Sequence, residues 1–183
     1  MAEATIPPTI ITQRLILRPF SRADIRAYSA VRAEPMVARW LRAPLPGETA
    51  DQISARVIDH FNQCWQRDGF GPWAITDAEH GRLIGHCGLR RLNELGGVEV
   101  IYALLPSHWR RGLASEAAAT ALDFGFGPAG LETIFAITLP HNRASRGVME
   151  KLGMGYRRDV SFNDFNVAYY DIDRATWMAR PTR

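Results

Sequence analysis

The chain has 183 residues, of which 46% are hydrophobic and 22% charged, and its formal net charge is +3. This length and balance suit one soluble domain with a substantial core. No apolar run has membrane-spanning length and the N-terminus lacks a signal-peptide pattern, so we expect a cytoplasmic protein without membrane contact. The arginines are scattered rather than clustered in stripes, which argues against nucleic-acid binding.

The two cysteines and five histidines give no sign of a metal centre. Cys64 and Cys87 form no CxxC pair, and the histidines are dispersed along the chain. Because metal-ligand spacing is missing, we predict no metal site. The cysteines are expected to be small buried hydrophobes rather than a disulfide or a nucleophile.

The N-terminal third is predicted to hold one strand and three helical segments. Residues 1–11 are a loose lead-in, and alternating apolar residues over 11–18 indicate a strand that ends at Pro19. A helix starts near Ser21, and a short helical piece covers about 36–41. The longest helix starts at Thr49 or Asp51 and ends at Gly69. Its apolar face is formed by Ile53, Val57, Phe61 and Trp65.

The remainder alternates between strands and helices. Strands are predicted over 71–76, 82–92, 98–105, 132–139, 156–162 and 167–173. Helices are predicted over 115–126 and 143–152, and residues 174–183 trail off after Trp177. An antiparallel run followed by a strand–helix–strand unit predicts an α/β fold, with a mixed, mostly antiparallel central sheet and helices on both faces. We expect a single domain over 1–183, with a core at about 12–177.

The most informative stretch is 98–126. A strand stops at Pro106, a short turn carries Arg110, Arg111 and Gly112, and a helix begins near Ser115. A helix N-terminus has unpaired N–H groups and a partial positive charge, so it attracts phosphate, and the two arginines add fixed charge. We therefore predict that this turn holds a phosphorylated cofactor.

Four segments together carry a resemblance to a known family. They are Thr12-x-Arg14-Leu15-x-Leu17-Arg18-Pro19, Glu99-Val100-Ile101-Tyr102-x-Leu104, the loop from Trp109 to Ala117, and the stretch from Asn142 to Met154. In this order, over nearly the whole chain, they resemble the GNAT acyltransferase superfamily in its RimJ/RimL-like branch of ribosomal-protein N-acetyltransferases.

The chain departs from the family pattern at three positions. Trp109 stands where the superfamily often has Gln or Arg, and Ile101 stands where Gly usually precedes the tyrosine. Some protein N-terminal acetyltransferases place a tyrosine general acid where this chain has Met149. Proton transfer by a tyrosine at that position is therefore excluded.

The resemblance implies acetyl transfer from acetyl-CoA to a primary amine, by direct attack in a ternary complex. The loop would bind pyrophosphate, and the edge of the central strand would pair with the pantetheine arm, with the N–H of Leu104 or Leu105 polarising the thioester carbonyl. For each arginine the alternative is a solvated surface charge. The expected cofactor-binding residues are Ala103, Leu104, Leu105, Trp109, Arg110, Arg111, Gly112, Leu113, Ala114, Ser115, Asn142, Ser145 and Arg146.

Three residues are candidates for proton transfer. Glu99 is the candidate base, directly or through water, and its alternative is a carboxylate at the surface. His86 carries an imidazole suited to proton transfer, and its alternative is a packed or hydrogen-bonded strand histidine. Ser145 matches the position of a thiolate-side hydroxyl in RimL-like enzymes. For Ser145 and Asn142, helix capping or cofactor binding is the alternative.

The acceptor is not selected by the sequence. Trp40, Phe70, Trp73 and His86 are expected to wall its pocket, with core packing as the alternative for Trp40. A protein N-terminus, an antibiotic, a polyamine and an amino acid all fit, and a homodimer is left open. A second function is a catalytically inactive CoA-binding sensor or interaction module. A nucleotide-phosphate binder fits less well, because no Gly-Lys-Ser/Thr follows the glycine.

Overall fold

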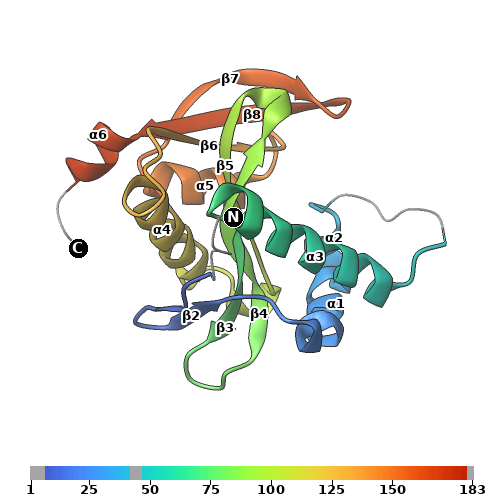
Figure 1. Cartoon of the computed structure of the whole chain (residues 1–183). Helices are drawn as coiled ribbons and strands as arrows, with labels where there is room; N and C mark the ends of the chain where they lie inside the picture. The colour runs from blue at the N-terminus through green and yellow to red at the C-terminus, as the bar shows by residue number, and fades with distance from the viewer. Residues whose placement is uncertain (1–6, 42–46, 181–183) are drawn as a thin grey trace.

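The computed structural model describes residues 7–41 and 47–180, which form one eight-stranded mixed sheet flanked by helices (Figure 1). The strand order is β1-β2-β3-β4-β5-β6-β8-β7, and all neighbours pair antiparallel except β5 and β6. The strands are β1 (Ile10–Ile11), β2 (Leu15–Arg18), β3 (Pro72–Asp77), β4 (Leu83–Leu92), β5 (Gly97–Leu104), β6 (Thr133–Thr138), β7 (Gly155–Phe162) and β8 (Phe165–Asp173). The predicted mixed α/β fold is confirmed.

Helices cover both faces of the sheet. They are α1 (Ile25–Ala33), α2 (Pro35–Ala38), α3 (Ala50–Asp68), α4 (Leu113–Phe126), α5 (Arg143–Lys151) and α6 (Arg174–Met178). Short 3-10 turns are η1 (Arg22–Asp24), η2 (Asn93–Leu95) and η3 (Pro106–His108). In Figure 1, α4 lies on one side of β3 and β4, and α1 and α3 lie on the other. No helix in the described ranges is long and apolar enough to cross a bilayer.

Two predicted elements need correction. The single strand expected over 11–18 is a hairpin, in which Ile10 pairs with Leu17, because the Thr12 hydroxyl accepts the Leu15 N–H and turns the chain. The segment from 174 does not trail off at once. It begins with α6, because the Asp173 carboxylate accepts the N–H of Thr176 and caps a helix. The predicted loop after α2 falls partly on residues outside the described ranges.

Each face of the sheet has its own core. On the α4 face, Ala117, Ala118 and Ala121 have no exposed surface, so the helix approaches the sheet closely. On the other face, Tyr28 of α1 and Phe61 of α3 pack against the sheet. Both cysteines are buried and free, as expected.

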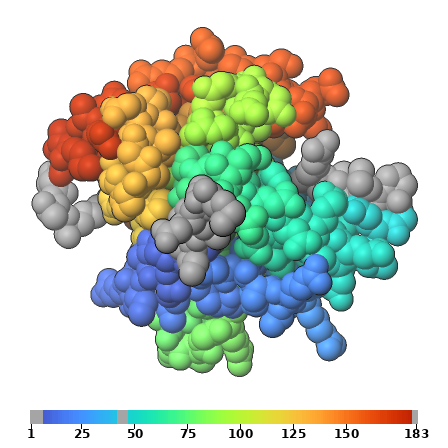
Figure 2. Space-filling model, viewed as in Figure 1, coloured from blue at the N-terminus to red at the C-terminus, as the bar shows by residue number. Residues whose placement is uncertain are grey.

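An aromatic cluster joins the C-terminal end of α3 to α4, and the surfaces of these two helices meet in the view of Figure 2. The Trp65 and Trp73 rings have centroids 4.8 Å apart, and each ring packs edge-on against Phe124. Trp73 has no exposed surface, and its indole N–H donates to the Pro8 carbonyl. Phe70 is buried in the same core. Both rings are buried in this core, so the structure shows them in packing contacts, and their predicted part in an acceptor pocket stays a prediction.

The sheet divides beside β5. Glu99 pairs in parallel with Phe135, whereas β6 continues along β8 up to the pair Thr138 and Ala168. On its other side β5 pairs with β4 from Gly97 to Leu104. Strand β5 is thus paired mainly with β4, and strand β6 mainly with β8. We call the place where β5 and β6 stop pairing the division, and one backbone edge at the end of β5 faces it.

Candidate active site

The backbone of β5 can be assigned residue by residue from one hydrogen bond. The Leu105 N–H donates to the Ile84 carbonyl at 2.9 Å. In an antiparallel pair, the backbone N–H and C=O groups of alternate residues point toward the partner strand. The backbone groups of Ala103 and Leu105 therefore point toward β4, whereas those of Tyr102 and Leu104 point toward the division. The prediction that Ala103, Leu104 and Leu105 all offer their backbone to the pantetheine arm is therefore corrected, because only Leu104 of the three does so on the edge that faces the division, which we call the rail. Of the two predicted oxyanion donors, Leu105 is excluded because its N–H is already bonded.

Trp109 holds the end of this rail. Its indole N–H donates to the Leu104 carbonyl at 2.6 Å, so the carbonyl has a partner on the open side of β5. The Leu104 N–H lies on the same edge, next to the start of the loop that leads to α4. Among the residues predicted for this strand end, Leu104 is the one whose N–H is positioned to donate into the division.

The loop before α4 has a backbone shape suited to an anion. Arg110 and Gly112 both adopt left-handed conformations, with φ of 58° and 77°. The helix begins at Leu113, two residues before the predicted start, and its first intrahelical bond runs from the Glu116 N–H to the Gly112 carbonyl. The unpaired N–H groups of Gly112, Leu113, Ala114 and Ser115 therefore lie together at the N-terminus of a 14-residue helix.

Cationic side chains lie around this loop. Arg110 and Arg111 are exposed, as a phosphate contact requires. Lys151, at the end of α5, was not selected from the sequence. Its ammonium nitrogen lies 3.8 Å from the point where a Cβ on Gly112 would sit. The available signal was that Lys151 is the chain's single lysine.

Arg146 has a different place from the one predicted. Its Nε donates to the Tyr170 hydroxyl at 2.8 Å, and its Nη1 donates to the Pro140 carbonyl at 3.2 Å. These partners lie on β8 and on the turn before α5, so the guanidinium anchors the helix to the sheet. The structure shows this anchoring role, and the predicted phosphate contact of Arg146 stays a prediction.

The first turn of α5 places a hydroxyl pair beside β5. Asn142 caps the helix, because its Oδ1 accepts the Ser145 N–H at 3.2 Å. The Ser145 hydroxyl lies 3.0 Å from the phenol oxygen of Tyr102, which also donates to the Ser145 carbonyl. Burial raises the pKa of Tyr102, so its phenol keeps its proton at neutral pH. Tyr102 was not selected from the sequence, although it stands in one of the four family segments.

Glu99 lies on the opposite face of β5. It is 4% exposed, and Nε and Nη2 of Arg90 each lie 2.7 Å from its Oε2. Burial raises the pKa of Glu99, and the charge and hydrogen bond of Arg90 and the Ile137 N–H offset part of that effect. The alternative of a surface carboxylate is excluded. A carboxylate with a raised pKa binds a proton more strongly than an exposed one does, as a general base requires.

His86 does not have the properties predicted for it. Its ring is buried beside Phe61, and its Nδ1 lies 2.9 Å from the Tyr28 hydroxyl. Burial, with the charges of Arg32 and Arg90, lowers the pKa of His86 to about 3. A group that binds protons so weakly is a poor general base at neutral pH. The catalytic and acceptor-binding predictions for His86 are therefore corrected to a packed strand histidine.

Trp40 is the remaining aromatic candidate. It is half-buried, and its ring centroid lies 5.5 Å from that of His141, in the turn before α5. The Arg39 guanidinium stacks over the same ring at 4.8 Å. Trp40 thus links the segment after α2 to the turn that precedes Asn142 and Ser145, and it lies outside both core clusters.

Comparisons with known proteins agree with the fold. A family model described as an acetyltransferase (GNAT) domain matches residues 14–155. The uncharacterized N-acetyltransferase YoaA of Bacillus subtilis is 31% identical over 147 residues, which cover 80% of this chain and 82% of YoaA. An acetyltransferase structure from Agrobacterium tumefaciens has a TM-score of 0.79 at 29% identity, over 91% of this chain and 94% of its own. RimJ of Mycobacterium smegmatis in complex with CoA-disulfide has a TM-score of 0.72 at 20% identity, over 88% and 83% of the two chains.

Proposed function

Because the chain belongs to the GNAT acetyltransferase family, and so is an N-acetyltransferase, we propose that it transfers an acetyl group from acetyl-CoA to a primary amine by direct attack in a ternary complex. GNAT domains use acetyl-CoA, and one similar structure holds a CoA compound. The bound donor supplies an acetyl group activated as a thioester. The acceptor is a protein N-terminus or a small-molecule amine. The resemblance to the RimJ/RimL-like branch supports a cytoplasmic enzyme.

One observation carries this proposal. At the division of the sheet, Glu99 lies on one face of β5, Tyr102 and Ser145 lie on the other, and the Leu104 N–H is on the edge of β5 that faces the division. A base and a hydroxyl pair are thus separated by one strand, with a hydrogen-bond donor between them. Each of these three groups can assist amide formation from a thioester.

Each group then has one task. Glu99 takes a proton from the acceptor amine, directly or through water. The Leu104 N–H donates to the carbonyl oxygen as negative charge develops there. The Ser145 hydroxyl, which is hydrogen-bonded to the Tyr102 phenol, donates a hydrogen bond to the leaving sulfur, and CoA departs as a thiolate. Trp40 lines the acceptor side.

The residues at the other end of the site fit the phosphates of the donor. The N–H groups from Gly112 to Ser115 are free of helix partners, and an anion at a helix N-terminus is favoured by both the dipole and the hydrogen bonds. The side chains of Leu113 and Ser115 are buried, so these residues contribute their backbone. Arg110, Arg111 and Lys151 add positive charge around the loop.

Thermal unfolding tests the binding part of the proposal. A ligand that binds only the folded state stabilises it by RT ln(1 + [L]/Kd), which is about 2.7 kcal/mol at a hundredfold excess over Kd. We expect acetyl-CoA to raise the melting temperature. If it leaves the melting temperature unchanged at millimolar concentration, the proposed function fails.

Release of CoA thiol with a panel of amines tests the chemistry. We expect Glu99→Gln to lower kcat by about 100-fold and to leave the Kd for acetyl-CoA within about twofold. Glu94→Gln, at an exposed position of η2, is the matched control and should keep the wild-type kcat. Binding without turnover on any amine would favour the alternative of an inactive CoA-binding module.

A further inference from the structure

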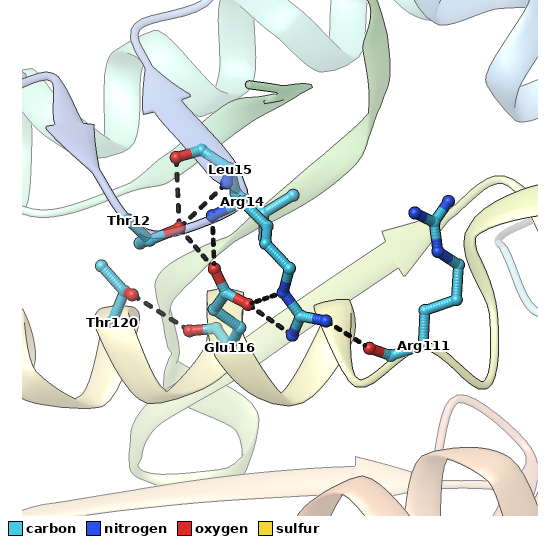
Figure 3. A network of polar contacts seen from close by, with 6 residues as sticks. All are labelled: Thr12, Arg14, Leu15, Arg111, Glu116 and Thr120. Carbon is cyan, nitrogen blue, oxygen red and sulfur yellow. Dashed lines mark hydrogen bonds and ion pairs between the residues drawn. The ribbon is translucent and has the colours of Figure 1, made fainter. Parts of the chain in front are cut away.

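The turn between β1 and β2 is fastened to the first turn of α4 through one carboxylate (Figure 3). Oε1 of Glu116 accepts the Thr12 hydroxyl at 2.6 Å and the Arg14 backbone N–H at 3.1 Å. Oε2 accepts Nε of Arg14 at 2.7 Å and pairs with Nη2 at 2.6 Å. We call Thr12, Arg14 and Glu116 the N-terminal clamp.

The clamp holds Glu116 in its charged form. Burial alone would raise the pKa of Glu116, but the hydrogen bonds from Thr12 and Arg14 outweigh it, and the pKa is lowered. Arg14 is therefore neutralised by a permanent partner. Such a cation is poorly suited to serve as a free phosphate ligand. The contact that Arg14 makes outside the clamp is therefore the one that can affect the cofactor site.

That remaining contact reaches into the pyrophosphate loop. Nη1 of Arg14 donates to the Arg111 carbonyl oxygen at 2.8 Å, while the Arg111 guanidinium points away from the clamp (Figure 3). In a trans peptide the C=O and the following N–H point in opposite directions. Fixing the Arg111 carbonyl on the Arg14 side therefore turns the Gly112 N–H to the opposite side of the loop.

The peptide between Arg111 and Gly112 needs such support. It lies beside Arg110 and Gly112, which both have positive φ, and glycine permits many backbone conformations. A left-handed conformation at a non-glycine residue is sterically unfavourable, so the loop does not hold this shape by intrinsic preference. A hydrogen bond from a charged donor offsets this cost.

We propose that Arg14 is a positioning residue for cofactor binding, which orients the Arg111–Gly112 peptide so that the Gly112 N–H faces the pyrophosphate. This inference rests on the proposed function. The side chain of Arg14 is 44% exposed, and an ion pair at such a site contributes little to folding stability because water screens it. Loss of the clamp should therefore alter cofactor affinity much more than it alters folding.

Calorimetric titration with CoA and with dephospho-CoA tests the proposal. Both ligands contain the pyrophosphate, so we expect Arg14→Ala to weaken both by the same factor, about 10-fold. Arg14→Lys keeps the charge but has one nitrogen in place of the three that contact Glu116 and Arg111, so it loses the fork geometry and should weaken both ligands similarly. Arg157→Ala removes a comparable exposed ion pair with Asp171 and is the matched control for stability.

The outcomes separate this inference from the proposed function. If wild-type protein binds neither ligand, the proposed function itself fails. If wild-type protein binds CoA and Arg14→Lys keeps its Kd, charge alone is sufficient and the positioning role is overturned. Weakening of CoA but not of dephospho-CoA would also overturn it, because it would place Arg14 at the 3′-phosphate. If Arg14→Ala does not fold, the lysine variant carries the test.

Discussion

The phenol oxygen of Tyr102 lies 3.0 Å from the hydroxyl of Ser145, and it also donates to the carbonyl of the same serine at 3.1 Å. One side chain of β5 therefore fixes both the first turn of α5 and the hydroxyl that this turn carries. Met149, at the position where some relatives of the fold carry a tyrosine, is buried in the core. The phenol reaches the proposed sulfur site from the strand instead of from the helix.

Tyr102→Phe should separate catalysis from binding. The change keeps the ring and removes the hydroxyl, so Ser145 loses its partner. We expect kcat to fall about 10-fold, KM for acetyl-CoA to change less than about twofold, and the free energy of unfolding to fall by about 1 kcal/mol. Steady-state kinetics and urea unfolding measure these effects. Tyr156→Phe, which removes an exposed hydroxyl bonded to Asp159, is the control. An unchanged kcat for Tyr102→Phe would remove this residue from the mechanism.

His86 should make stability depend on pH. Its pKa is about 3 in the folded protein, below the ordinary value of 6.5, because the ring is buried. Below pH 6.5 the unfolded chain therefore binds a proton that the folded chain does not, and stability falls as the pH is lowered toward 3. The slope is about 1.4 kcal/mol per pH unit, so this residue alone removes about 2 kcal/mol between pH 7 and pH 5.

Urea unfolding of His86→Gln at pH 7 and pH 5 tests this account. Glutamine keeps an acceptor for the Tyr28 hydroxyl and does not titrate, so the difference between the two pH values should shrink by about 2 kcal/mol. The same change at an exposed histidine, His141→Gln, controls for the loss of an imidazole as such. A difference as large in His86→Gln as in wild type would contradict the burial of a neutral ring.

Local signals in the sequence were sufficient for most of the elements. Thr49 caps α3 through the Gln52 N–H, and Gly69 ends it in a left-handed conformation, as the residue types predicted. The glycine-containing turn before α4 was also found, because an arginine pair and a helix start leave a local pattern. These features depend on residues within a few positions of one another, and such residues are visible in a sequence.

The remaining errors came from contacts between distant segments. The side of β5 on which Leu105 donates depends on its register with Ile84, which no local pattern fixes. The hydrogen bond from Arg146 to Tyr170 of β8 could not be foreseen from the residues around Arg146. The role of His86 was misjudged because α1 places Tyr28 over it. In each case a polar group received a protein partner that lies at least 20 residues away along the chain.

Trp109→Phe should weaken cofactor binding through the backbone of β5. The indole N–H donates to the Leu104 carbonyl at 2.6 Å, and phenylalanine fills much of the space without that donor. The end of the rail then loses its restraint, so we expect KM for acetyl-CoA to rise about fivefold with a smaller change in kcat. Steady-state kinetics at saturating amine provides the measurement. A fall in kcat at constant KM would instead assign Trp109 to the chemical step.

Lys151→Met should reduce affinity for CoA in a way that depends on salt. The ammonium group lies beside Gly112, exposed to solvent, so its attraction for phosphate acts through water and is screened by ions. We expect Kd to rise about fivefold at 50 mM salt and less than about twofold at 500 mM, where the Debye length is about 4 Å. Arg158→Met removes the same charge from an exposed position of the outer strand β7 and should leave Kd unchanged. Equal weakening at both salt concentrations would mean that Lys151 shapes the loop by packing, because a packing contact is not screened.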